Sequence, residues 1–131
     1  MKVAIIDDNL VFRKLTKIAF EHVAPGKVDV LLFENGKEAI DHIKEHIEKE
    51  LQVPKLILLD LNMPIMDGWD FLEEMLPIKN DRQLDLVIYI VSSSADEDDI
   101  KRAKNISDVK GYIIKPIDIN QITQFVSDFM E

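Results

Sequence analysis

The sequence contains no cysteine and no long apolar segment. The absence of cysteine excludes a disulfide framework, a thiol nucleophile and a thiolate metal site. Every apolar run is far shorter than the ~20 residues that a membrane-spanning helix needs. At the N-terminus, the acidic pair Asp7-Asp8 comes too early for a secretory signal. We therefore expect a cytoplasmic protein with no membrane partner.

Positive charge is also scarce, because 16 Lys and Arg stand against 25 Asp and Glu and leave a net charge of -9. Nucleic-acid binding requires clustered cations to neutralise phosphates, so we expect no nucleic-acid partner. The contents of 47% apolar and 31% charged residues are those of an ordinary globular protein. The length of 131 residues suits one domain with a real core, and we expect a single domain over 1–131.

Short apolar runs, typical of buried strands, alternate with amphipathic segments along the chain. Strands are predicted at 2–6, at 28–33, in the run 55–59 that leads to Asp60, at 86–91 and at 111–114. The first helix is predicted after the cap Asn9, with apolar residues at helical spacing (Val11, Leu15, Ile18 and Ala19). The second is predicted after Asn35-Gly36, with apolar residues on one side (Ala39, Ile40, Ile43 and Ile47). The third should run from Trp69 to about Met75, the fourth should begin at a capping box of Ser94 and Glu97, and the fifth should follow the cap Asp118. Near Pro77 the third helix should end, and a polar connection should follow over 79–85.

This alternation predicts an α/β fold in which helices cover both faces of a parallel sheet. In such sheets ligands bind beyond the carboxyl ends of the strands. Four of the five predicted strands end at a chemically reactive group, and all of these groups should emerge at one edge of the sheet. They are Asp7 with Asp8, Asp60, Ser92 and Lys115.

Three carboxylates that converge would repel one another unless a cation lies between them. Mg²⁺ prefers oxygen ligands and keeps several waters, so it suits carboxylates together with a phosphoryl oxygen, and Mn²⁺ could substitute for it. We expect Asp8 and Asp60 to bind the metal directly, Asp7 to act through a water, and the backbone carbonyl of Asn62 to be a further ligand. The lack of Cys and of nearby His argues against zinc.

Asp60 is then a candidate nucleophile, because carboxylates form aspartyl-phosphate intermediates in known covalent catalysis. Phosphoryl transfer mainly needs positioning and charge neutralisation. The Lys115 ammonium can neutralise one phosphoryl oxygen, and the Ser92 hydroxyl can donate a hydrogen bond to another. The small side chains of Ser93 and Ser94 would leave the acceptor open.

These motifs resemble those of the response-regulator receiver domains of two-component signalling. They occur in order along the whole chain, as Asp7-Asp8 after the first strand, Asp60 to Gly68 (DLNMPIMDG), Val91-Ser92-Ser93, and Gly111 to Pro116 (GYIIKP). Departures are mild, since many relatives have Thr at the position of Ser92 and an aromatic residue at that of Ile117. Relatives often have a cis bond before the proline that matches Pro116.

The resemblance implies a flavodoxin-like fold with strand order 2-1-3-4-5, here as a stand-alone receiver similar to chemotaxis regulators, with no output domain. A histidine kinase or a His-phosphotransfer protein would phosphorylate Asp60, and the domain would catalyse its own phosphorylation and dephosphorylation with Mg²⁺. Ser92 and Tyr112 would form the switch pair. They would report phosphorylation to a protein target on the face of the fourth helix, fifth strand and fifth helix.

Other interpretations remain beside this one. A phosphohydrolase of the haloacid-dehalogenase type places an acidic residue two positions after its nucleophile, where this chain has Asn62. A flavodoxin would need a phosphate-binding loop where Asp7-Asp8 would repel phosphate. The domain could also act as a docking module without phosphorylation. Among single residues, Asp67 is interpreted as a helix cap, Tyr112 equally as an edge aromatic, and His42 with His46 as a solvated helix face.

Overall fold

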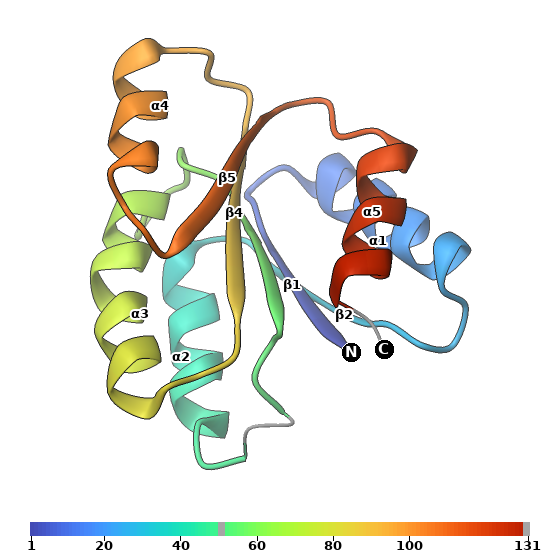
Figure 1. Cartoon of the computed structure of the whole chain (residues 1–131), viewed down its shortest axis with the longest axis horizontal. Coiled ribbons are helices and arrows are strands. Elements are labelled where there is room, and N and C mark those ends of the chain that lie inside the picture. The colour runs from blue at the N-terminus through green and yellow to red at the C-terminus, as the bar shows by residue number, and fades with distance from the viewer. Residues whose placement is uncertain (50–51, 130–131) are drawn as a thin grey trace.

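The computed structural model describes residues 1–49 and 52–129. Its strands form one parallel sheet in the order β2-β1-β3-β4-β5 (Figure 1). The predicted flavodoxin-like order is thereby confirmed. The strands are β1 (Lys2–Ile6), β2 (Asp29–Phe33), β3 (Leu56–Leu59), β4 (Val87–Ser92) and β5 (Val109–Ile114). Because the order reverses between β1 and β3, the carboxyl ends of these two strands are the expected position of a ligand site.

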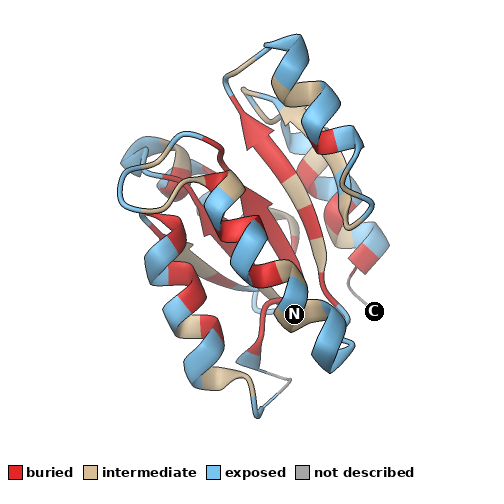
Figure 2. Ribbon diagram, turned by 90° about the vertical axis from the view of Figure 1, so that its left-hand side faces the viewer, coloured by how far each residue is buried: buried red, intermediate tan, exposed pale blue. Residues whose placement is uncertain are grey.

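Helices cover both faces of the sheet. On one face lie α1 (Leu10–Val23) and α5 (Ile119–Phe129), and on the other lie α2 (Gly36–His46), α3 (Gly68–Arg82) and α4 (Glu97–Lys104) (Figure 1). Successive side chains of β1 alternate between two cores, with Val3 and Ile5 packed toward the α1–α5 side and Ala4 and Ile6 toward the other. All of β3 is buried, and Figure 2 shows red, buried segments in the strands at the centre of the sheet, so the unbroken apolar run of β3 follows from burial on two faces.

The helix α1 forms where its spacing predicted, and Asn9 caps it by accepting the Phe12 N–H at 2.9 Å. Three of the four apolar residues that gave this helical spacing are nevertheless outside the core. Val11, Leu15 and Ile18 are each more than 60% exposed. The buried side consists instead of Arg13, Thr16 and Phe20. The sequence periodicity therefore predicted the helix but not which of its faces packs on the sheet.

The predicted end of α3 was wrong, because the helix continues through Pro77 to Arg82. Pro77 lies on the exposed side, where the carbonyl that loses its helical partner can bond to water. The extra turn is stabilised by ion pairs of Lys79 with Asp108 and of Arg82 with Glu48, both at 2.9 Å. The predicted polar connection therefore shrinks to the short segment after Gln83, which ends the helix in the left-handed conformation.

The caps predicted for the last two helices had different outcomes. The capping box of Ser94 and Glu97 was wrong, because α4 begins at Glu97 and Asp96 is its cap. Ser94 instead donates its hydroxyl to Asp99 at 2.9 Å and accepts from the Asp96 N–H at 3.2 Å. The cap Asp118 is confirmed. It exchanges hydrogen bonds of 2.9 Å with Gln121, one in each direction.

Backbone hydrogen bonds continue the sheet one step past the strand ends. Asp7 N–H donates to Phe33 O at 3.0 Å, Asp60 N–H to Ile6 O at 2.9 Å, and Lys115 N–H to Ser92 O at 2.8 Å. These bonds fix the backbone from which three of the predicted site residues project. Within residues 1–49 and 52–129, no helix combines the length and the apolar character needed to cross a membrane.

Candidate functional site

Three carboxylates meet at the carboxyl edge of the sheet, where β1 and β3 end. One oxygen each from Asp7, Asp8 and Asp60 lies within 4.8 Å of the other two. Asp7 and Asp60 are buried, whereas Asp8 is exposed and leaves the cluster open to solvent. An all-oxygen set of this kind matches the preference of a hard divalent cation such as Mg²⁺. The residues fit the metal that the sequence predicted.

Asp7 is held by its neighbours in the loop between β1 and α1. Its Oδ1 accepts the Asn9 N–H at 2.9 Å, and its backbone carbonyl accepts the Arg13 guanidinium at 2.7 Å. Arg13 is only 6% exposed, and its guanidinium also pairs with Glu34 at 3.5 Å. The sequence reasoning missed Arg13, because a lone arginine in the first turn of a helix carries no pattern that predicts burial.

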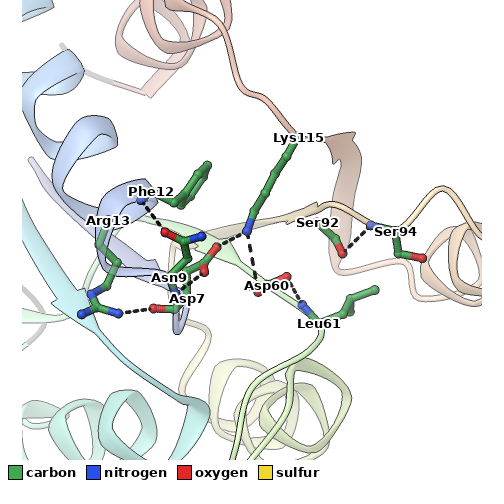
Figure 3. Close-up of polar contacts among 9 residues, drawn as sticks. All are labelled: Asp7, Asn9, Phe12, Arg13, Asp60, Leu61, Ser92, Ser94 and Lys115. Carbon is green, nitrogen blue, oxygen red and sulfur yellow. Dashed lines mark hydrogen bonds and ion pairs between the residues drawn. The ribbon is translucent and has the colours of Figure 1, made fainter.

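Lys115 extends from the end of β5 across the acidic cluster (Figure 3). Its Nζ lies 2.6 Å from Asp7 Oδ2 and 3.7 Å from Asp60 Oδ2. Within the described parts of the chain, Asp7 Oδ2 accepts no hydrogen bond of regular geometry, so this ion pair is its main polar contact. The Lys115–Pro116 peptide bond is cis, as the resemblance implied. Lys115 thus lies where it can contact either carboxylate.

Asp60 combines burial with incomplete charge compensation. Burial raises the pKa of its carboxyl group to about 6, and the nearby carboxylates of Asp7 and Asp8 act in the same direction. The Lys115 ammonium and the Leu61 N–H, which donates to Asp60 Oδ1 at 2.8 Å, act against the shift. A perturbed carboxyl at a strand end and beside other charged groups is typical of a functional site.

Gly68 allows the backbone around Asp60 to close tightly. Its N–H donates to Leu61 O at 3.0 Å. A Cβ at this position would lie only 2.4 Å from the carbonyl oxygen of Asp60 and 2.9 Å from Leu61 Cα. In the sequence, Gly68 is distinguished only as the last residue of the DLNMPIMDG motif. Its actual importance is a close approach between two backbone segments, which appears only when the loop is folded.

Ser92, Ser94 and Tyr112 form a separate polar cluster beside the acidic one. The Ser92 hydroxyl oxygen, fully buried, accepts the Ser94 N–H at 3.1 Å. The Tyr112 hydroxyl donates to the Ser94 carbonyl at 2.8 Å. Ser94 therefore connects the two residues that the resemblance pairs as a switch. Sequence reasoning assigned Ser94 only a small size and a cap, and missed this connecting position.

The remaining candidates have simpler positions. Asp67 caps α3 by accepting the Asp70 N–H at 2.9 Å, as predicted. Asn62 is exposed just beyond the cluster, and its carbonyl as a ligand stays a prediction. The rings of His42 and His46 stack on α2, with their centroids 4.2 Å apart. They belong to no cluster of metal-ligating side chains, because in residues 1–49 and 52–129 the one such cluster is that of Asp7, Asp8 and Asp60.

With this geometry established, comparison with known proteins identifies the family. The family model described as the response regulator receiver domain matches residues 3–127. The chain belongs to the response regulator receiver domain family. It is therefore a signalling domain of two-component systems rather than a typical metabolic enzyme, which excludes the hydrolase and flavodoxin interpretations.

Individual relatives agree with this membership. The chain is 27% identical to the probable methanogenesis regulatory protein FilR2 of Methanothrix harundinacea, over 98% of this chain and 81% of that protein. It is 28% identical to the chemotaxis protein CheY of Bacillus subtilis, over 96% and 94% of the two chains. A solved structure of the phosphorylated cyanobacterial phytochrome response regulator RcpA superposes with a TM-score of 0.76 at 30% identity, over 97% and 89%. In several other curated relatives the matched segment is only about a fifth of a longer protein.

Proposed function

We propose that this receiver domain accepts a phosphoryl group on Asp60 from a histidine kinase or a His-phosphotransfer protein, with the help of Mg²⁺. The observation that carries the proposal is the placement of Asp60 within 4.8 Å of two further carboxylates, with Lys115 Nζ at 3.7 Å. The 30% identity to a response regulator whose solved structure is phosphorylated supports it.

The metal would be held by Asp8 and Asp60, with Asp7 acting through a water and the Asn62 carbonyl as a further ligand. When bound, Mg²⁺ supplies positive charge that offsets the carboxylates and the incoming phosphoryl oxygens. Because Asp8 is the exposed member of the cluster, it offers the metal its approach from solvent.

In the proposed step, a carboxylate oxygen of Asp60 attacks the phosphorus of a phosphohistidine. The new O–P bond forms while the N–P bond breaks, and the electron pair leaves with the imidazole nitrogen, which takes a proton from solvent. Lys115 turns from Asp7 toward a phosphoryl oxygen and neutralises it. In the dephosphorylation step, water attacks the phosphorus. The O–P electron pair returns to the Asp60 carboxylate, and phosphate and a proton are released.

The Ser92 side chain would turn to donate its hydroxyl to the phosphoryl group, and this rotation would weaken the bond that it now accepts from the Ser94 N–H. Moving an equilibrium from 1:99 to 99:1 needs about 5.5 kcal/mol. Two or three charge-assisted hydrogen bonds at ~1.5–3 kcal/mol each reach that figure. The change at Ser94 would then pass to Tyr112, whose hydroxyl bonds to the Ser94 carbonyl.

The target would bind on the face formed by α4, β5 and α5. A groove of about 430 Å³ there is lined by Ile100, Ala103 and Tyr112, among other residues. Lys104 and Lys110 also line it, so an amphipathic protein segment with acidic residues would match its chemistry. Tyr112 belongs both to this groove and to the cluster around Ser94, which supports a route by which a change at Ser94 would reach the proposed binding surface.

The test is the intact mass of the protein after incubation with acetyl phosphate or phosphoramidate and Mg²⁺. Wild type should gain one phosphoryl group, and Asp60→Asn should gain none. Omitting Mg²⁺ or adding EDTA should also abolish the adduct. Asp67→Asn is the matched control, since asparagine is as good a helix cap as aspartate and this residue lies outside the acidic cluster. An adduct that persists in Asp60→Asn would refute the assignment.

A further inference from the structure

An aromatic ring completes the surroundings of the Lys115 ammonium. Lys115 Nζ lies 4.4 Å from the centroid of the Phe12 ring, within the range of a cation–π interaction. The Lys115 side chain is only 17% exposed, which strengthens such an interaction because less water competes for the charge. Figure 3 shows the Phe12 ring on the same side of Lys115 as Asp7. The ammonium therefore has three partners, namely two carboxylates and one ring.

These partners differ in what happens to them during the proposed reaction. Asp7 and Asp60 are both assigned to the metal, and Asp60 also takes the phosphoryl group. Each carboxylate therefore loses part of its attraction for Lys115 once it has a second positive partner. The face of the Phe12 ring binds no metal and keeps its negative potential throughout. Phe12 is the partner that stays unchanged as the site fills.

The position of Phe12 is itself fixed by the site. Its backbone N–H donates to Asn9 Oδ1 at 2.9 Å, and the Asn9 N–H donates to Asp7 Oδ1 at 2.9 Å. The backbone of Phe12 is therefore only two hydrogen bonds away from the carboxylate that pairs with Lys115. The Phe12 side chain is half-buried and packs against the core on the α1–α5 side of the sheet.

We propose that the ring of Phe12 is a positioning group that holds the Lys115 ammonium beside the phosphoryl acceptor when the carboxylates are engaged elsewhere. Phe12 touches neither the metal ligands' oxygens nor the phosphoryl group and acts through Lys115. This proposal rests on the proposed function only for its kinetic consequence. The ammonium–ring contact itself can be tested in the absence of metal and of phosphoryl donor.

The contact is tested by NMR on protein labelled with ¹³C at the lysine ε position. The ring current of Phe12 should displace the Lys115 ε-proton resonance upfield, and Lys115→Met assigns that resonance by deleting it. The displacement should be present without metal, remain when Mg²⁺ is added, persist in Phe12→Tyr and vanish in Phe12→Leu. A Lys115 resonance at the position of the solvent-exposed lysines, in the wild type or after Mg²⁺ addition, would overturn the proposal.

The kinetic consequence is tested by the rate of phosphorylation with acetyl phosphate. Phe12→Leu should lower the rate by about three- to tenfold, the range that a partly desolvated cation–π contact covers, while Phe12→Tyr stays within about twofold of wild type. In a Lys115→Met background, Phe12→Leu should have no further effect, because a positioning residue acts only through its partner. Equal losses in both backgrounds would mean a general structural role and would refute the proposal.

Two controls keep these outcomes distinct. Urea unfolding of each variant shows whether the fold is intact, and Phe12→Met replaces Phe12→Leu if the leucine variant does not fold. If wild type itself gains no phosphoryl group, the proposed function fails, whereas the NMR result still decides whether Phe12 holds Lys115. If wild type is phosphorylated and the lysine resonance is not displaced, only the role of Phe12 fails.

Discussion

The acidic cluster and the serine–tyrosine cluster lie side by side at the end of the sheet, but their polar groups are satisfied to different degrees. Asp7, Asp8 and Asp60 bring three carboxylates within 4.8 Å, against one ammonium within ion-pair distance of two of them. In the second cluster, Ser94 accepts from the Tyr112 hydroxyl, donates its N–H to Ser92 and donates its own hydroxyl to Asp99. The acidic cluster therefore has too little positive charge to balance its carboxylates, whereas the polar groups of the serine–tyrosine cluster are hydrogen-bonded to one another.

Under the proposed function, this difference corresponds to two tasks, which are binding the phosphoryl group and responding to it. The acidic cluster is assembled before any ligand arrives, and its excess negative charge attracts a cation. Under the proposed function, the second cluster would exchange existing hydrogen bonds for new ones, and each such bond contributes only about 1 kcal/mol. Perturbing the first cluster should therefore have large effects on stability, and perturbing the second should have small effects on stability but clear effects on signalling.

The largest effect is expected from Gly68→Ala. The added Cβ would lie 2.4 Å from the Asp60 carbonyl oxygen, and neither backbone segment can move without disturbing the acidic cluster. Overpacking of this kind should lower the free energy of unfolding by about 3 kcal/mol. Urea unfolding measures the loss, and phosphorylation of the variant should slow in parallel.

The matched control for this change is Gly26→Ala. Gly26 has a φ of +71° but no atom within 4 Å of an added Cβ, so its substitution should cost only the conformational penalty of about 1 kcal/mol. Equal losses at the two glycines would show that contact with Asp60 is unimportant.

The second prediction concerns the pH dependence of the metal-free protein. Burial raises the pKa of Asp60 to about 6 from its ordinary value of 3.8, so the folded state binds this proton more tightly than the unfolded state does. The protonated Asp60 carboxyl group therefore adds on the order of 2 kcal/mol to the free energy of unfolding below about pH 4. This contribution is lost as the pH rises through about 6. Asp60→Asn cannot ionise. It should therefore be more stable than wild type by about 2 kcal/mol at about pH 7.5 in EDTA, with little difference at about pH 4.

Addition of Mg²⁺ distinguishes this effect from a general benefit of asparagine. The cation favours the ionised carboxyl group, so it should reduce or reverse the advantage of Asp60→Asn at about pH 7.5. Urea unfolding at a series of pH values, with and without Mg²⁺, gives both comparisons. A stability difference that does not change with pH would contradict the assignment of this carboxyl group as the buried, uncompensated charge.

Much of the acidic cluster could be predicted from the sequence because its causes are local. Short apolar runs predicted the strands, a parallel sheet brings their carboxyl ends to one edge, and the residues that follow those runs are the carboxylates and Lys115. The caps Asn9 and Asp118 were also predicted, since a cap depends on the residues within one turn of it. The strand order came from the family resemblance, and the structure confirms it.

The parts that could not be predicted depend on contacts between distant segments. Arg13 is buried because the Asp7 carbonyl and Glu34 bind it, and Leu15 is exposed because that face of α1 lies away from the sheet. The helix α3 continues past Pro77 because Asp108, far along the chain, pairs with Lys79. Likewise, Ser94 loses its predicted capping role to Asp96 and bonds to Tyr112. Tertiary contacts therefore decide the faces of α1 and the length of α3, whereas at Ser94 the nearby Asp96 is the competing cap.

The smallest effect is expected from Tyr112→Phe, which removes the hydroxyl donor to the Ser94 carbonyl and keeps the ring. It should lower the free energy of unfolding of the unphosphorylated protein by about 1 kcal/mol and speed hydrogen exchange of the backbone amides around Ser94. Phosphorylation with acetyl phosphate and Mg²⁺ should shrink the difference from wild type, if the active state no longer uses this bond.

Tyr89→Phe is the matched control on the neighbouring strand β4, because no hydrogen bond of the Tyr89 hydroxyl occurs within the described residues. Its effect should stay below about 0.5 kcal/mol and should not depend on phosphorylation. If Tyr112→Phe behaves like Tyr89→Phe in both states, the hydroxyl of Tyr112 is not part of the switch. If its cost is instead the same before and after phosphorylation, the bond to Ser94 is structural, and the signal must leave the acidic cluster by another route.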